Sequence, residues 1–365
     1  MKHLTKKLMA WLWLPLASAA ALSSCSMMHE DRGDCPTGLY LGFRYDYNLE
    51  RADMFADHVG AVDVYVFDAD GHYVTTLSDA NHGAVRPLAR PGYLMHAELA
   101  PGKYKFIALA GSTDYASQME AGRAHFVRTE PGKGDAMETL RVRLETDGRA
   151  EAAVRVDNHG QPLDTLWHGM ETELVEVFAE RPTYHTISLV RDTKKINVTL
   201  RELDDPSAMD VANYDMTITD RNAALRWDNS LDESQTVIYT PHATWNTEDR
   251  TPANDANGER AGGIGRMAHA DFMTSRIMLH ADPADDGIMS ITNRLTGIEV
   301  VRVNLPDLLS RLRTSEEIYR YSAQEFLDRG YDYRLDFYLK GDRLAYVNIS
   351  ISILGWSKRV QFEDL

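Results

Sequence analysis

Short runs in which apolar and polar residues alternate recur along most of the chain. This period of two is typical of β-strands, because successive side chains of a strand point to opposite faces of its sheet. In the first half, the runs predict strands at residues 39–45, 62–67, 72–77, 104–110, 137–144 and 173–178. In the second half, they predict strands at residues 185–190, 196–200, 214–218, 236–239, 271–279, 298–303, 335–339 and 346–354. Short strands at this spacing favour an all-β fold of two tandem β-sandwich domains over a βαβ fold.

The remaining segments set the domain organisation. Helical spacing predicts only a few short helices, at residues 48–58 with Asn48 as N-cap, and at residues 306–313 and 323–329. A chain of 365 residues exceeds the size of a usual single core, so two domains are expected. We place the boundary near Arg181-Pro182, which gives an N-terminal domain at 37–181 and a C-terminal domain at 182–365. The polar, glycine-containing residues 241–268 are expected to form a long exposed loop.

The sequence Asp68-Ala69-Asp70-Gly71 separates two of the alternating runs. Such a sequence favours the turn of a β-hairpin, with the glycine supplying a positive φ. The same residues are similar to the start of a calcium-binding loop, which spans about twelve residues. The later ligands of such a loop are missing from the sequence, so the hairpin is the better interpretation.

Residues 1–25 have the features of a membrane-targeting segment. Three lysines precede an apolar run at residues 8–16, which is too short to span a bilayer of roughly 30 Å and therefore predicts a signal peptide. The segment ends in Leu22-Ser23-Ser24-Cys25, which resembles the lipobox of bacterial lipoproteins. That resemblance implies that residues 1–24 are removed, that Cys25 is acylated, and that residues 25–36 form a tether to the outer membrane. Ordinary secretion with a chance cysteine is the alternative.

Charge and cysteine content narrow the range of partners. Removal of residues 1–24 deletes three lysines and no acid, so the formal charge changes from −16 to −19. A chain this acidic is repelled by nucleic acid, and no basic segment with interleaved aromatics offsets the charge. Cys35 is the only cysteine besides Cys25, so no intramolecular disulfide framework is expected in the mature protein.

The motifs of common catalytic sites are missing. The sequence contains no G-x-S-x-G elbow, no H-E-x-x-H motif and no phosphate-binding glycine loop. Its thirteen histidines are scattered, and its many carboxylates are better explained as an acidic surface than as a glycosidase pair. We therefore expect neither an enzyme nor a bound cofactor or metal.

Several segments, in their order along the chain, resemble the fimbrillin-associated anchor lipoproteins of Bacteroides-type (type V) fimbriae. They are residues 34–39, 43–48, 62–70, 101–104, Leu166-Trp167-His168-Gly169, 189–198 and 351–356. The resemblance implies two transthyretin-like Greek-key sandwiches and a surface-exposed lipoprotein at the base of a fimbrium. Its partners would be the fimbrial structural subunits (fimbrillins), to which it would bind through β-strand complementation. In this way it would help to assemble the fimbrium or to control its length.

The resemblance also suggests which strands take part. Shaft subunits of such a system lose an N-terminal strand to an arginine-specific protease, and a strand of a neighbour fills the groove. Cleavage at Arg44 or Arg51 would separate this chain from its lipid, so we expect the strand at residues 39–45 to be kept. The segment expected to exchange is C-terminal, where Val347, Ile349, Ile351 and Ile353 alternate with Asn348, Ser350, Ser352 and Leu354. The alternative is that this segment is the last strand of its own sheet.

Two other functions remain open from the sequence. One is a tip or accessory adhesin of the same fold, and the other is a surface lipoprotein that binds glycans for nutrient uptake. The adhesin would bind a host protein or glycan through its groove or exposed loops, with Trp227, Trp245 and Trp356 as candidate sugar platforms. Structural tryptophans are the alternative at all three positions.

Overall fold

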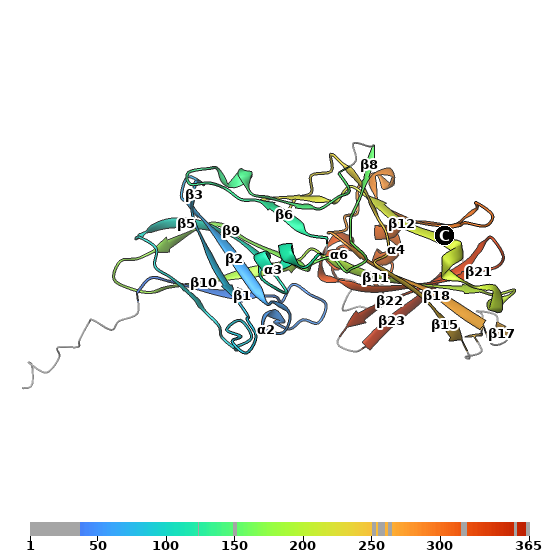
Figure 1. Cartoon of the computed structure of the whole chain (residues 1–365). Helices are drawn as coiled ribbons and strands as arrows, with labels where there is room; N and C mark the ends of the chain where they lie inside the picture. The colour runs from blue at the N-terminus through green and yellow to red at the C-terminus, as the bar shows by residue number, and fades with distance from the viewer. Residues whose placement is uncertain are drawn as a thin grey trace, which may run out of the picture.

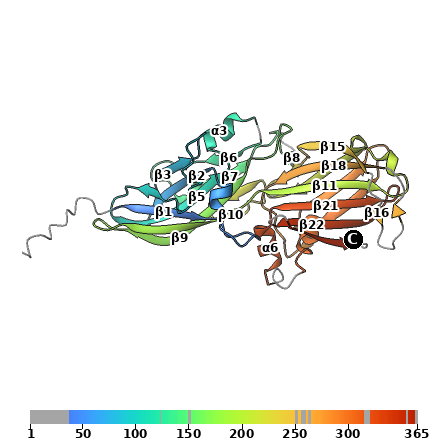
Figure 2. The same cartoon turned by 90° about the horizontal axis from the view of Figure 1, so that it is seen from below.

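The protein is an elongated all-β molecule with one group of sheets at each end (Figures 1 and 2). The structure is a computed structural model that describes residues 37–122, 124–148, 152–249, 253–254, 260–261, 265–314, 320–353 and 356–362. Sheets pack face to face in both parts, with short helices at their margins. The predicted all-β sandwich fold is confirmed.

A seven-stranded sheet forms most of the first part, in the order β3-β2-β5-β9-β10-β1-β4. Its strands are β1 Leu39–Arg44, β2 Ala61–Asp68, β3 Tyr73–Ala80, β4 Met95–Ala97, β5 Gly102–Gly111, β9 Leu166–Val177 and β10 Thr183–Arg191. Strand β1 lies inside the sheet, where it is parallel to β10 and antiparallel to β4. Strands β2 and β3 form the hairpin predicted from the Asp68–Gly71 turn, in which Gly71 has a φ of 87°.

Two smaller sheets each take a strand from the other half of the sequence. The three-stranded sheet, in the order β13-β7-β6, contains β6 Phe126–Thr129, β7 Arg141–Leu144 and the late strand β13 Ala224–Arg226. The five-stranded sheet, in the order β20-β19-β12-β14-β8, contains β12 Tyr214–Asp220, β14 Thr236–Tyr239, β19 Ile288–Asn293, β20 Glu299–Asn304 and the early strand β8 Ala153–Arg155. The two parts of the molecule are therefore joined by an exchange of strands (Figure 1).

A six-stranded sheet completes the second part, in the order β15-β18-β11-β21-β22-β23. Its strands are β11 Lys194–Glu202, β15 Ala243–Asp249, β18 Gly265–Thr274, β21 Asp332–Leu339, β22 Leu344–Ile353 and β23 Trp356–Phe362. A separate two-stranded ribbon pairs β16 Ala253–Asn254 with β17 Arg260–Ala261. The prediction of a loop at 241–268 was wrong at both ends, because β15 and the start of β18 pair with each other there.

Four short α-helices are described: α2 Phe55–His58, α3 Tyr115–Glu120, α4 Leu305–Ser310 and α6 Ala323–Arg329. The 3₁₀ turns are η3 Met137–Thr139, η4 Pro206–Ala208, η5 Val211–Asn213 and η6 Pro283–Asp285. The helices expected at residues 306–313 and 323–329 correspond to α4 and α6. The helix expected at residues 48–58 shrinks to α2, because the buried Asn48 amide donates to the carbonyls of Tyr45 and Ala52 and shapes a loop.

The passage between the two large sheets lies one strand later than the boundary near Arg181-Pro182. Strand β10 follows that point but pairs with β9 and β1 in the first sheet. The chain enters the six-stranded sheet only after Asp192-Thr193, where β11 begins. Arg181 and Pro182 belong to the turn between β9 and β10.

Two apolar clusters fill the molecule. One covers a face of the seven-stranded sheet and includes Leu39, Leu41 and Phe43 of β1 together with Phe55 of α2. The other begins at the opposite face, under the three-stranded sheet, and continues through the sandwich of the five- and six-stranded sheets. This continuous core explains how short exchanged strands such as β8 and β13 are held in place.

Candidate functional site

The N-terminal strand β1 is firmly built into its sheet. Leu39 and Leu41 are fully buried, Phe43 is 7% exposed, and all three pack into the apolar cluster described above. The Phe43 ring stacks on Phe55 at a centroid distance of 5.4 Å. Strand β1 pairs with β10 along its whole length and with β4 over its first three residues, Leu39 to Leu41.

The C-terminal residues chosen for strand exchange lie inside the protein's own sheet. Strand β22 pairs with β21 on one side and with β23 on the other. Val347 and Ile349 are fully buried, Ile351 is 1% exposed, and Ile353 packs partly against the same core. The arrangement therefore matches the alternative given above, that the segment is a strand of its own sheet. Donating β22 to another subunit would expose its buried side chains and the core beneath them to solvent.

The tryptophan platforms are not assembled in one place. Trp245 is 41% exposed and stacks on His269 at 5.1 Å, on the edge strand β15. Trp227 is half-buried against the large core, and its carbonyl accepts a hydrogen bond from His168. The side chain of Trp356 lies outside the described residues. Cys25 and Cys35 lie outside them too, and no described helix combines the length and apolar character needed to span a bilayer.

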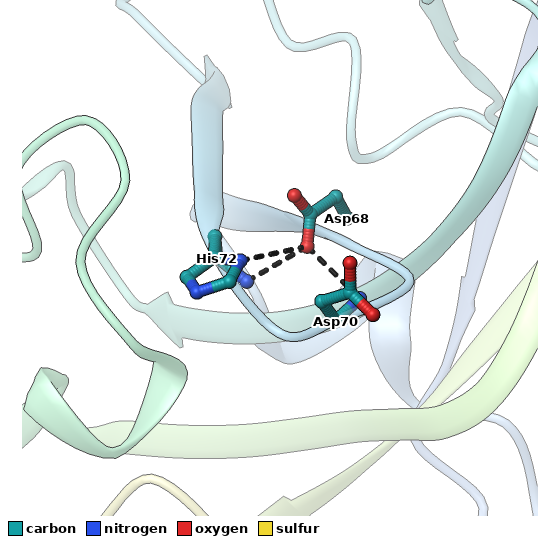
Figure 3. A group of neighbouring side chains, drawn as sticks. All are labelled: Asp68, Asp70 and His72. Carbon is teal, nitrogen blue, oxygen red and sulfur yellow. Dashed lines mark hydrogen bonds and ion pairs between the residues drawn. The ribbon is translucent and has the colours of Figure 1, made fainter.

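Asp68, Asp70 and His72 gather at the tip of the first hairpin (Figure 3). One oxygen of Asp68, Oδ1, accepts hydrogen bonds from the backbone N–H groups of His72 at 2.9 Å and Asp70 at 3.0 Å. These backbone hydrogen bonds, that of His72 foremost, lower the pKa of the Asp68 carboxyl. The cluster is therefore explained by turn formation, because its central carboxylate already caps the backbone of the turn.

The most unusual constellation lies where β10 passes into β11. Asp192, Thr193 and Lys194 are fully buried, and Arg191 is 4% exposed. The Lys194 Nζ donates to the backbone carbonyls of Asp328 and Gly330 at 2.8 Å each and of Arg191 at 3.2 Å. Asp328 and Gly330 are at the C-terminal end of α6, where orphan carbonyls and the helix dipole favour a cation. Lys194 thereby fastens α6 to the link between the two large sheets. We use the name junction network for the buried charged residues Arg191, Asp192, Lys194, Arg276 and Asp328.

A bidentate ion pair completes the junction network. Arg276 Nε and Nη2 donate to the two carboxylate oxygens of Asp328 at 2.8 and 2.9 Å. Its Nη1 donates to the carbonyl of Asn229 at 2.6 Å, and the Asn229 amide donates to Asp192 at 3.0 Å. Burial raises the pKa of Asp192 and lowers that of Lys194. The network thus connects β11 and α6 with the three loops that carry Asp192, Asn229 and Arg276, through charge-assisted hydrogen bonds.

Aromatic rings enclose Arg191 beside this network. Its guanidinium lies 4.2 Å from the Tyr331 ring centroid and 5.3 Å from that of Trp167. Trp167 in turn packs edge-on against Tyr45, the residue that follows β1, at 5.9 Å. The Arg329 guanidinium of α6 lies 4.0 Å from the Tyr47 ring. The segment after β1 is therefore packed directly against the junction of the sheets.

His168 adds a pH-dependent element to the same region. Its Nε2 donates to the Trp227 carbonyl at 2.9 Å, and burial lowers the pKa of the ring to about 4. An unfolded chain binds a proton at His168 below about pH 6.5, whereas the folded chain stays neutral down to about 4, so stability is lost as pH falls between these values. The full effect is about 3 kcal/mol.

We expect His168→Gln to remove this loss. The free energy of unfolding of the unmodified protein and of His168→Gln is measured with urea from pH 7 to pH 4. The difference between the two reports His168 alone, because all other groups titrate in both proteins. The difference in unfolding free energy should shift by up to about 3 kcal/mol in favour of the glutamine variant at low pH. A difference that stays constant across this range would contradict the buried neutral histidine.

The sequence contained part of this site. The segments 166–169 and 189–198 were noted only for their resemblance to the family, and the structure packs Trp167 against Arg191 between adjacent strands. A side chain at Gly169 would lie 2.6 Å from Leu189 and 2.8 Å from Ile187, so β9 and β10 approach closely there. The sequence did not indicate the roles of Arg276, Asp328 and Asn229. Single polar residues that are far apart in the sequence have the pattern expected of exposed surface positions.

Solved structures of surface and fimbrial proteins share this fold. A candidate adhesin from Bacteroides thetaiotaomicron is 26% identical, with a TM-score of 0.69 over 89% of this chain and 98% of that one. The fimbrial anchor protein Mfa2 from Porphyromonas gingivalis has a TM-score of 0.54 over 89% of this chain and 99% of that chain. At 17% identity the latter match establishes the fold alone.

The sequence comparison identifies the family. The chain belongs to the fimbrillin-A associated anchor proteins Mfa1 and Mfa2, whose family model matches residues 32–362. The minor fimbrium anchoring subunit Mfa2 of Porphyromonas gingivalis is 23% identical over an alignment of 363 positions, which covers 97% of this chain and 96% of that protein. The resemblance drawn from the sequence is thus confirmed, and the chain is associated with cell-surface fimbriae as a member of a structural rather than an enzymatic family.

Proposed function

We propose that this protein anchors a fimbrium to the outer membrane through acyl chains on Cys25 and takes part in fimbrial assembly through β-strand complementation. The observation that carries the proposal is the position of β1. The expected tether at residues 25–36 leads straight into an interior strand of the seven-stranded sheet. A fimbrial load applied to the folded protein would therefore reach the lipid through a strand that is hydrogen-bonded on both sides.

Retention of β1 fits this task. Its withdrawal would expose Leu39, Leu41 and Phe43, and burying each such side chain contributes about 1.5–3 kcal/mol. Arg44 is at the end of the strand, opposite Ser188 of β10, so a protease would have to unpair the peptide before cutting there. We therefore propose that the anchor keeps the strand that shaft subunits of the system lose.

The junction network suits the same mechanical role. Force that enters through β1 passes to Tyr45 and Tyr47, which contact Trp167 and Arg329 respectively. From there, the ion pair of Arg276 with Asp328 and the hydrogen bonds of Lys194 lead into the six-stranded sheet. Buried, hydrogen-bonded pairs hold a fixed geometry, which would keep the two parts of the molecule in one orientation under load.

Strand complementation is proposed at the outer edge of the six-stranded sheet. Among the residues that the structure describes, β23 pairs with β22 alone, so one of its edges offers backbone groups for pairing. An incoming strand of a fimbrial subunit can add to that edge of β23, with main-chain hydrogen bonds giving affinity. We place the exchange at residues 356–362 rather than at Val347, Ile349, Ile351 and Ile353, because these four belong to the interior strand β22.

The lipid is tested with Cys25→Ala. We expect metabolic labelling with a fatty acid to be lost and the protein to move from the membrane fraction to the soluble fraction. Cys35→Ala is the matched control and should stay labelled and membrane-bound. A Cys25→Ala protein that remains in the outer membrane with its label would contradict the proposed anchor.

A further inference from the structure

The outer face of the three-stranded sheet carries an arginine-lined groove of about 620 Å³. Its floor is formed by the outward side chains of β6, β7 and β13, and the loop that carries Asp232 forms one wall. In Figure 1 the label of β6, the labelled strand of this sheet, lies between those of β9 and β8. None of the strand-exchange, tryptophan or junction residues described above lines this groove.

The strand register arranges the floor in two rows. Arg141 of β7 pairs with Thr129 on one side and with Arg226 on the other. In the next row, Arg143 lies between Val127 and Ala224. The first row therefore puts two arginines directly opposite each other, an arrangement that is unfavourable unless an anion joins them.

The protein supplies that anion in the first row only. Asp232 places one oxygen 3.3 Å from Arg141 Nη1 and the other 3.7 Å from Arg226 Nη2. Arg143 in the second row is exposed and has no hydrogen-bond or ion-pair partner among the described residues. Its neighbours Val127 and Ala224 are aliphatic, which leaves room above the sheet at this position.

We propose that this groove binds a carboxylate-bearing, extended segment of a partner protein, with Arg143 as the principal contact. Guanidinium groups recognise carboxylates through paired hydrogen bonds, and Asp232 already occupies the equivalent place in the first row. None of the described residues that line the groove is aromatic, so these residues offer no flat ring on which a sugar could stack. Val127, which is 38% exposed, offers an apolar contact beside the charge.

Three arginines and two carboxylates, Asp232 and Glu145, line the groove. This small positive excess is a local exception in a chain of net charge −16, so charge complementarity favours acidic partners here. If the proposed function holds, the partner is a fimbrial subunit. Recognition of a carboxylate by the groove does not depend on that function. A binding measurement on the purified full-length chain therefore tests the groove without reference to fimbrial attachment.

The probe is a synthetic peptide in which Glu and Val alternate, so that an extended conformation puts all carboxylates on one face. Its control is the same peptide with Gln in place of Glu. We expect titration calorimetry to give at least about tenfold weaker binding for the Gln peptide and for Arg143→Ala, as for the loss of a charge-assisted pair. Arg294→Ala, an exposed arginine of the β19–β20 turn, is the matched control and should bind as the unmodified chain does.

A second variant moves affinity in the opposite direction. Asp232→Asn removes the internal competitor from Arg141 and Arg226, so the Glu peptide should bind about three- to tenfold more tightly. This gain cannot arise from misfolding. Equal binding of the Glu and Gln peptides, or unchanged binding by Arg143→Ala, would overturn the proposal. So would preferential binding of an oligogalacturonate, which would assign the groove to an acidic glycan.

Discussion

Asp328→Ala should destabilise the folded protein by about 3–5 kcal/mol, because it leaves a largely buried arginine without its partner. Arg276 donates to both oxygens of Asp328, and the Gln324 amide donates to Oδ1 of the same carboxylate. The Asp328 side chain is 8% exposed and that of Arg276 is 17% exposed, so water cannot replace the lost hydrogen bonds well. Urea unfolding at neutral pH measures the change.

The matched control is Asp215→Ala. Asp215 and Arg294 also form an aspartate–arginine pair, at 3.4 Å, but both side chains are more than half exposed. Surface pairs contribute little, so a change within about 0.5 kcal/mol is expected. Similar small effects for both variants would show that the junction network does not hold the two parts of the molecule together.

Deletion of residues 346–365 should prevent the C-terminal sandwich from folding. It removes nearly all of β22, whose Val347, Ile349 and Ile351 are buried in the core. The loss of these three side chains alone amounts to roughly 5–9 kcal/mol, against a domain stability of about 5–15 kcal/mol. Circular dichroism and thermal unfolding of the truncated chain should show a missing or strongly lowered transition.

Deletion of residues 354–365 should behave differently. It removes the edge strand β23 but leaves β22 paired with β21, so the protein should fold with a reduced melting temperature. If β23 is the exchanging strand, this folded variant should reach the membrane yet retain few fimbriae. Normal retention by it would contradict strand complementation at this edge while leaving lipid anchoring untouched.

The alternation of apolar and polar residues was sufficient to predict the strands but not their places in the sheets. Leu39, Leu41 and Phe43 stand out in the sequence because one face of β1 is buried. The same pattern at Val347, Ile349 and Ile351 suits a donated strand and an interior strand equally well, since both bury one face. Only the pairing with β21 and β23 distinguishes them.

The junction network could not be predicted from the sequence, for a different reason. Arg191, Asp192 and Lys194 form a charged run between two predicted strands, a composition typical of an exposed turn. They are buried because partners from residues 229, 276 and 328 converge on them, and such distant pairings leave no local pattern. Strands β8 and β13 have three residues each, which is too short for a period of two to be recognised.

The central claim is that lipid on Cys25 holds a fimbrium on the cell. The most direct measurement is the partition of fimbriae between cells and medium, by immunogold microscopy of intact cells and by assay of fimbrial subunit in the medium, for the unmodified protein, Cys25→Ala and Cys35→Ala. We predict that Cys25→Ala releases assembled fimbriae into the medium while Cys35→Ala retains them. Fimbriae that stay attached to cells producing only Cys25→Ala would contradict the claim.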